Sequence, residues 1–245
     1  IAPLSDFILG SDQASVAILP AGHVHEIYTP DQEDMGSASA FALLMAHRAR
    51  MVRRAVDDRP ASPLPILWVR ECGTARKWGH VYPPGLSELG IGPGDILYVD
   101  TDDSLSLLRS VVEGLGCAAF GAVIADLSSM RRGRWDLTAS RRLVLAARRS
   151  GVTALCFCGD AGPVPSAAHS RRQVAAVLSS MREAMAPGNP AFDIRLLRHR
   201  GGVDGLHMQV EWNRDGQFFQ NAPDIGAAHR LSEIGTHIAA MRRRA

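Results

Sequence analysis

Lysine is almost missing from this chain of 245 residues. Of its 27 basic side chains 26 are arginine, and Lys77 is the single lysine. Nucleotide-binding loops commonly need a lysine that reaches the outer phosphate oxygens. Such a loop is therefore excluded everywhere except around Lys77.

Cysteine is scarce as well, and its pattern excludes a disulfide framework at this length. Cys156 and Cys158 lie in the apolar run ALCFC, which is typical of a buried strand with both thiols on one face. Cys72 and Cys117 are isolated in the sequence. We therefore expect buried free thiols rather than a metal site, and the reducing cytoplasm as the compartment.

Long apolar runs are also missing, so the sequence indicates no membrane-spanning helix. The first residues have no basic stretch followed by an apolar core, so secretion is not indicated either. With 46% hydrophobic and 21% charged residues, the composition is typical of a globular α/β protein.

Continuous apolar runs alternate with helical patterns over the first two thirds of the chain. Strands are predicted at 24–28, 65–71, 120–127 and 152–159, and helices at 38–55, 103–115 and 137–151. Such strands predict a mostly parallel sheet covered by helices on both faces, that is, three layers. From about residue 163 the short connections predict an antiparallel extension of the sheet. We expect an irregular lead-in (1–20), one core domain (21–215) and a helical tail with a basic end (216–245).

The turn TPDQEDMGS follows the first strand and precedes the first helix, where nucleotide-binding proteins place G-x-x-x-x-G-K-[ST]. Gly36 is followed by Ser37 instead of lysine, and nearby carboxylates oppose a triphosphate. The residues equivalent to the phosphate loop are Thr29, Pro30, Asp31, Asp34, Gly36 and Ser37, with Glu33 adding a third carboxylate. We expect no cofactor, and ATP with magnesium is the disfavoured alternative.

The order of strands and polar strand ends resembles the RecA-type core. ILWVRE is similar to the strand that ends in the catalytic glutamate, which falls on Glu71, and AVIADL to the metal-holding strand, with its acid at Asp126. LLRHRGG is similar to the strand whose paired cations reach ATP across a subunit interface, here Arg198 and Arg200.

Within this group, several segments are similar to the ImuA family, over about residues 18–213. They are HEI, PPGLSELGI, WDLTASRRLVLAARRSGVTALC and LLRHRGGVDGLHMQVEW. ImuA is the RecA-like accessory protein of the bacterial inducible mutasome, often labelled a SulA-type cell-division inhibitor. The resemblance implies a role in SOS-induced, error-prone translesion DNA synthesis. It also implies an inactive Y-family DNA polymerase homologue (ImuB-like) and an error-prone C-family DNA polymerase as partners. Single-stranded DNA, RecA or further copies of the chain are additional partners to consider, and no membrane is expected.

Glu71 and Asp126 have two interpretations. Without the loop lysine we favour a vestigial or structural role at strand ends over catalysis. The alternative is a DNA-stimulated ATPase with Glu71 as base and Asp126 holding magnesium, and a third possibility is a cell-division inhibitor. Arg198 and Arg200 either line a subunit interface or contact the acidic turn in place of a nucleotide.

Arginine-rich segments supply candidates for DNA contact. A basic loop beside an aromatic residue is a surface that suits single-stranded DNA. The candidates are Arg131, Arg132, Arg134 and Trp135 after the Asp126 strand, and Arg171 and Arg172 further on. The arginine pairs in helix 137–151 favour a solvated helix face. His23 and His25 are expected on one side of a strand without a third metal ligand.

Overall fold

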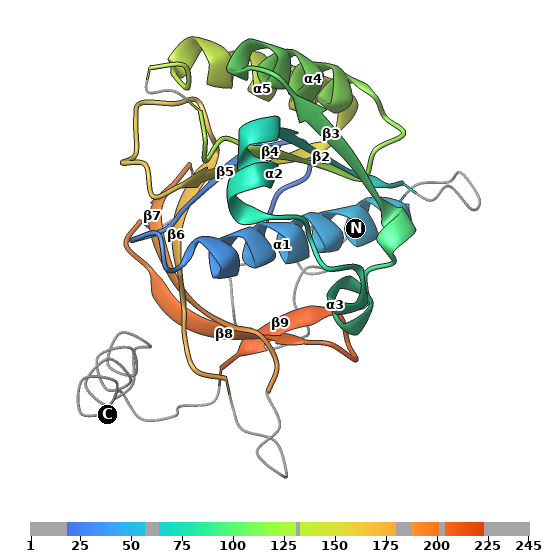
Figure 1. Cartoon of the computed structure of the whole chain (residues 1–245), viewed down its shortest axis with the longest axis vertical. Helices are drawn as coiled ribbons and strands as arrows, with labels where there is room; N and C mark the ends of the chain where they lie inside the picture. The colour runs from blue at the N-terminus through green and yellow to red at the C-terminus, as the bar shows by residue number, and fades with distance from the viewer. Residues whose placement is uncertain (1–18, 57–63, 131–132, 180–187, 201–203, 223–245) are drawn as a thin grey trace.

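A mixed sheet forms the centre of the computed structural model, which describes residues 19–56, 64–130, 133–179, 188–200 and 204–222 (Figure 1). Its nine strands are in the order β3-β2-β4-β5-β1-β6-β7-β8-β9. The strands from β3 to β6 in this order are parallel, and β7, β8 and β9 are antiparallel to their neighbours. The parallel strands are β1 (Val24–Tyr28), β2 (Ile66–Glu71), β3 (Ile96–Thr101), β4 (Ala122–Asp126), β5 (Thr153–Gly159) and β6 (Ser170–Ala176). The antiparallel strands are β7 (Ala191–His199), β8 (His207–Asn213) and β9 (Phe218–Asn221).

Helices cover both faces of the parallel part, which gives three layers (Figure 1). Helix α1 (Met35–Val56) lies on one face, and α4 (Ser104–Gly116) and α5 (Leu137–Ser150) lie together on the other. The shorter helices α2 (Cys72–Trp78) and α3 (Pro83–Glu88) and the 3-10 turn η3 (Pro93–Asp95) connect β2 to β3. Each face has its own apolar core, one around α1 and one beneath α4 and α5.

Local sequence signals explain where α5 begins and ends. The carboxylate of Asp136 accepts a hydrogen bond from the Ala139 amide at 2.7 Å, which satisfies one of the amides at the helix start. Gly151, with a φ of 75°, ends the helix in the left-handed conformation that glycine adopts at little cost. Leu143 and Ala147 are buried against the sheet.

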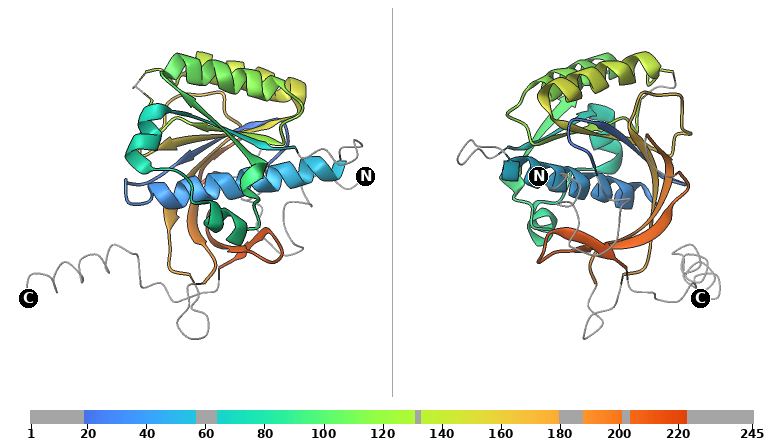
Figure 2. Two further views of the ribbon diagram at one scale, coloured as in Figure 1. Left: turned by 45° about the vertical axis from the view of Figure 1, so that its right-hand side comes forward. Right: turned by 180° about the vertical axis from the view of Figure 1, so that it is seen from behind.

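The antiparallel strands curve round α1, so that β8 and β9 lie on the far side of this helix from the parallel strands (Figure 2). Aromatic side chains fill the space between them. The ring of Phe41 on α1 lies 5.4 Å from the ring of Phe192 and 5.3 Å from that of Phe219. Helix α1 is therefore enclosed by the sheet, which explains its many buried residues.

The predicted fold class is confirmed: the sheet is mostly parallel, is covered on both faces and has an antiparallel extension. Strand β6 pairs in parallel with β1 as well as antiparallel with β7. Strand β9 lies in the range predicted as a helical tail, so that prediction is wrong for Phe218–Asn221, and the sheet extends past residue 215. Most of the lead-in (1–18) and of the tail (223–245) lies outside the described residues. Among the helices that the structure describes, none is long and apolar enough to cross a membrane.

Candidate functional site at the carboxyl edge of the sheet

The turn between β1 and α1 is short. Strand β1 ends at Tyr28 and α1 begins at Met35, which leaves the six residues 29–34. The amide of Thr29 donates to the carbonyl of Gly159 at 2.9 Å, so the chain stays paired with β5 as it leaves the strand. The carboxylate of Asp31 accepts from the Glu33 amide at 3.0 Å, which stabilises the turn internally. The acidic turn, residues 29–34, is thus a tight connection rather than a wide loop around phosphates.

Asp34 fastens this turn to the neighbouring part of the sheet. Its Oδ1 accepts a hydrogen bond from the backbone amide of Ala176, the last residue of β6, at 2.7 Å. Burial raises the pKa of Asp34, and the nearby carboxylates of Asp31 and Glu33 raise it further, against the lowering effect of the Ala176 bond. A carboxylate therefore occupies the start of α1, where a phosphate-binding protein presents amide groups to its ligand.

Met35 fills the space beside the acidic turn. Its side chain is buried, and its sulfur lies 4.0 Å from the Thr29 hydroxyl. The fit against β5 is close, because a Cβ added to Gly159 would lie 3.1 Å from the Met35 sulfur. A thioether in contact with the strand ends leaves an apolar surface where phosphate oxygens would need hydrogen-bond donors. Gly36 and Ser37 follow in the first turn of α1, and Gly36 is exposed.

Glu71 is engaged by hydroxyl groups at the end of β2. Its Oε1 accepts from Ser104 at 2.6 Å, at the start of α4, and its Oε2 lies 3.5 Å from the Ser129 hydroxyl. Ser129 is in turn 2.6 Å from the Thr74 hydroxyl on α2. This network joins the segments after β2, β3 and β4, as expected for a structural carboxylate.

Asp126 is buried at the end of β4 and is tied to its own loop. Its Oδ1 accepts from the Ser128 hydroxyl at 2.6 Å and from the Ser128 amide at 3.1 Å. Burial raises the pKa of Asp126, while the two bonds from Ser128 lower it. The described residues contain no group of three or more histidine, cysteine, aspartate or glutamate side chains placed to hold a metal ion.

These residues do not fit ATP with magnesium. The turn is acidic, Met35 occupies the space beside it, and both strand-end acids already have protein partners. The single lysine cannot substitute, because its Nζ lies on α2, 4.6 Å from the ring centre of Trp78.

Arg198 and Arg200 lie away from the acidic turn. Nη1 of Arg198 donates to the Ser166 carbonyl at 3.4 Å, and the Arg200 amide donates to the His169 carbonyl at 2.9 Å. Arg198 lies near the end of β7 and Arg200 directly after it, and this end of β7 pairs with the start of β6. Asp34 instead bonds to the other end of β6. The predicted contact between these arginines and the acidic turn is therefore wrong, because the antiparallel direction of β7 carries them to the opposite edge. Their role at a subunit interface stays a prediction.

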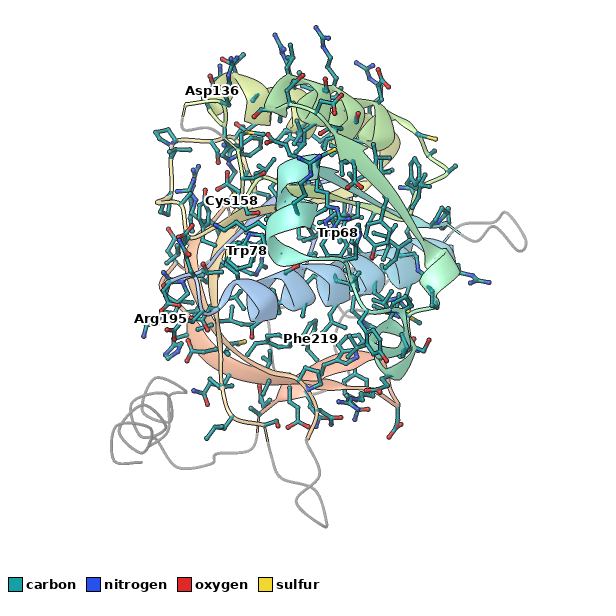
Figure 3. The ribbon with its side chains drawn as sticks, in the orientation of Figure 1. Trp68, Trp78, Asp136, Cys158, Arg195 and Phe219 are labelled. Atoms are coloured by element: carbon teal, nitrogen blue, oxygen red, sulfur yellow. The ribbon has the colours of Figure 1, made fainter. Side chains whose placement is uncertain are left out.

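Arg134 lines a surface pocket between the starts of α4 and α5. The pocket has a volume of about 210 Å³, and Arg142, Ser104 and Thr138 also line it. Asp136, labelled in Figure 3, marks the start of α5 at this pocket. Arg134 is exposed, as a nucleic-acid contact requires. Arg131 and Arg132 lie outside the described residues.

Trp135 is buried, so its predicted role as a stacking platform for DNA bases is wrong. Its indole Nε1 donates to Oε1 of Glu26 at 2.9 Å, and only 8% of the residue is exposed. Glu26 lies fully buried in the middle of β1. A buried carboxylate needs donors, and the glutamate within the apolar strand VHEIY was the sequence signal that a partner had to exist.

Arg171 and Arg172 are engaged inside the protein and do not form a DNA-binding surface. Arg171 Nε pairs with Oε2 of Glu26 at 2.8 Å, and its Nη2 donates to the Val164 carbonyl at 2.6 Å. Arg172 is 1% exposed, and burial lowers its pKa to about 10. The alternation of β6 explains both positions, since Arg171 faces the α5 side and Arg172 the α1 side of the sheet.

His23 and His25 lie on one side of the sheet, as their spacing predicts. Both rings contact His169, with ring centres 4.5 Å and 5.7 Å away. Nδ1 of His25 is 2.7 Å from the hydroxyl of Ser170. Burial is the main cause that lowers the pKa of His25 far below its usual value, so this imidazole is neutral.

Comparison with known proteins supports the fold. No protein-family model matches the chain, and no curated protein matches its sequence. Among solved structures, the crystal structure of the RadB recombinase is similar to this chain, with a TM-score of 0.53. The two sequences are 12% identical over 83% of this chain and 92% of that chain. The chain therefore has a RecA-like fold.

Proposed function

We propose that this chain is a RecA-like protein that acts by binding, without a nucleotide switch, as an accessory factor in error-prone DNA synthesis after DNA damage. The main support for the proposal is that protein atoms fill the position that a bound phosphate would occupy. The Asp34 carboxylate bonds to Ala176, and Met35 packs against Gly159, where a nucleotide-dependent relative would need open space and donors. A RecA-like fold with this turn binds partners through its surfaces and neither binds nor hydrolyses a nucleoside triphosphate.

The biological context of the proposal rests on the resemblance of the sequence to ImuA. On this basis the partners are an inactive Y-family polymerase homologue and an error-prone C-family polymerase. Single-stranded DNA is a further partner, and the exposed Arg134 at the α4–α5 pocket supports contact with a DNA backbone. Such contact would be salt-sensitive and independent of base sequence.

Calorimetry with ATP and ADP in the presence of magnesium tests the central claim, with and without oligothymidylate. We expect no heat of nucleotide binding in either condition. Saturable binding that disappears in Asp126→Ala would refute the proposal and support a DNA-stimulated ATPase.

Co-purification tests the biological context separately. After tagging the chain in cells exposed to a DNA-damaging agent, we expect the two polymerase-type partners in the eluate. Recovery of a tubulin-like division protein in their place would refute the role in DNA synthesis and support inhibition of cell division.

A further inference from the structure

The segment RRLVLAARR of helix α5 is symmetrical about Leu145. Arg141 and Arg142 precede this leucine by four and three residues, and Arg148 and Arg149 follow it by three and four. On an α-helix these spacings place side chains on neighbouring turns of one face. Leu145 is therefore surrounded by four guanidinium groups.

The face that carries Leu145 is turned to solvent. Leu145 is 64% exposed, the most exposed leucine of the described chain, and all four arginines are exposed. The opposite side of α5 packs on the sheet through Leu143 and Ala147. Figure 3 shows side chains with nitrogen tips that project outward from the α4–α5 layer. The helix thus needs neither Leu145 nor the arginines for its own packing.

No residue of α5 itself balances the positive charge on this face, and Asp136, just before the helix, is the one acid that lines the pocket at its start. Helix α5 contains no acidic residue, and none of its four arginines forms an ion pair with another residue that the structure describes. Elsewhere some buried arginines have carboxylate partners, such as Arg50 with Asp95 at 2.9 Å. Solvated helices gain stability from acids placed three or four residues from their arginines, and α5 has none on its exposed face.

The same face continues into the pocket at the start of the helix. Arg142 lines this pocket together with Leu105 and Leu108 of α4. Leu105 is 47% exposed, and Leu137 at the first turn of α5 is 38% exposed. Apolar side chains therefore accompany the arginines from the pocket to Leu145.

We propose that the outward face of α5, centred on Leu145 and extending to the pocket, is the docking surface for an acidic segment of a protein partner. Carboxylates of that segment pair with the arginines, since a guanidinium group binds a carboxylate through two parallel hydrogen bonds. An apolar side chain of the segment covers Leu145, and a second enters the pocket beside Leu105. Arginine is enriched at the centres of interfaces.

The exposed leucines favour a protein partner over a nucleic acid for this face. A phosphate backbone would use the arginines but would gain nothing from covering Leu145, which is 64% exposed. This inference rests on the proposed role as a binding protein and identifies which surface receives a partner. It does not depend on whether nucleotide binds at the carboxyl edge of the sheet, and DNA that contacts Arg134 at the pocket would compete with the acidic segment.

Three synthetic peptides test the surface on the whole chain by fluorescence anisotropy. The first consists of glutamate, alanine and leucine, with its leucines three or four residues apart. The second has alanine in place of leucine, and the third has lysine in place of glutamate. We expect saturable binding of the first peptide alone, weakened by salt.

Variants then locate the binding site. Leu145→Glu should weaken binding of the acidic peptide by about 30-fold, as for an interface centre. Leu197→Glu is the matched control, because Leu197 is also exposed (39%) but lies on β7, and it should leave binding unchanged. Arg148→Glu, which leaves Leu145 in place, should also weaken binding.

Two results would overturn the inference: equal binding of the leucine and alanine peptides, or a Leu145→Glu variant that binds the acidic peptide as well as the parent chain does. A competition experiment with oligothymidylate tests whether the face binds nucleic acid instead. If oligothymidylate binds α5 through the arginines and excludes the acidic peptide, with no effect of the uncharged change Leu145→Ala on DNA affinity, the face is a nucleic-acid site and the proposal is wrong. Nucleotide binding by the parent chain would refute the proposed function but leave this surface unaffected.

Discussion

The carboxylate of Asp34 and the backbone amide of Ala176 are hydrogen-bonded at 2.7 Å, across 142 residues of sequence. This bond joins the turn after β1 to the end of β6, two strands that lie side by side in the sheet. In a nucleotide-dependent protein of this architecture a ligand would be held near this place, and its presence could change the conformation. Here the protein itself supplies a bond at this place.

Replacing Asp34 by alanine should lower the free energy of unfolding by about 1–2 kcal/mol, because the Ala176 amide loses its acceptor. Asp34→Asn keeps an acceptor oxygen and should have a smaller effect. Urea unfolding followed by circular dichroism measures both. Asp31→Ala is the control, since Asp31 is exposed and bonds only within the turn. An equal loss for Asp31→Ala would contradict a special role of the Asp34 bond.

A second prediction concerns Glu26. Glu26→Ala should destabilise the protein by about 3–5 kcal/mol, because it leaves the charge of Arg171 without a partner in a largely buried site. Trp135→Phe removes the indole donor and part of a buried ring, and should cost about 2 kcal/mol. Thermal unfolding of the two variants gives the comparison, and a smaller effect of Glu26→Ala than of Trp135→Phe would refute the ion pair as the main stabilising contact.

The fold could be predicted from the sequence because its strands are continuous apolar runs with helical patterns between them. The strand at 24–28 and the helix at 137–151 were placed to within a residue. The hairpin partner Phe218–Asn221 was missed, since FFQN is short and its apolar residues become informative only when paired with β8.

The candidate site was predictable in part. The missing lysine and the acidic turn are visible in the sequence, and the carboxylates at Glu71 and Asp126 lie at strand ends as predicted. Sequence alone could not tell an exposed arginine from a buried one. Arg134, Arg171 and Arg172 look alike in a basic sequence, but Glu26, 145 residues away from Arg171, takes that side chain into the interior. A local sequence pattern does not reveal partners that lie so far apart in the chain.

Acid should destabilise the protein through His47. Burial is the main cause that lowers the pKa of His47 to about 4, while its Nε2 donates to Gln217 at 3.2 Å. Because the unfolded state binds the proton with a pKa near 6.5, the contribution to stability is complete above pH 6.5 and is lost as the pH falls toward 4. The loss for this group is at most about 3 kcal/mol.

Urea unfolding between pH 7 and pH 4 measures this dependence. His47→Gln should flatten it. His169, whose pKa is also lowered to about 4 chiefly by burial, adds to the same trend. A parent protein as stable at pH 4.5 as at pH 7 would contradict the assignment of neutral histidines.

Ser128 should matter most at neutral pH. Its hydroxyl donates to the buried carboxylate of Asp126 at 2.6 Å, so Ser128→Ala removes a bond to a charged group and should cost about 1.5–3 kcal/mol. The substitution also raises the pKa of Asp126 further above its usual value. The difference between parent and variant should therefore shrink as the pH falls and the carboxyl becomes protonated in both. A difference that grows on acidification would show that Asp126 is not the group concerned.

Arg134 and Trp135 should differ in their effect on DNA binding, although they are adjacent. Arg134 is exposed at the α4–α5 pocket, whereas Trp135 is bonded to Glu26 inside the core. Arg134→Ala should weaken oligothymidylate binding and reduce the slope of log K against log salt by about 0.7, the value for one phosphate contact on a single strand. Arg54→Ala changes an exposed arginine at the end of α1; it is the control and should change neither the affinity nor the slope.

Trp135→Phe should leave the affinity unchanged in the folded protein, because the indole does not reach the surface. A loss of DNA affinity in Trp135→Phe without a loss of folded structure would mean that the loop opens to bind, and that the buried position of Trp135 is only one of its states.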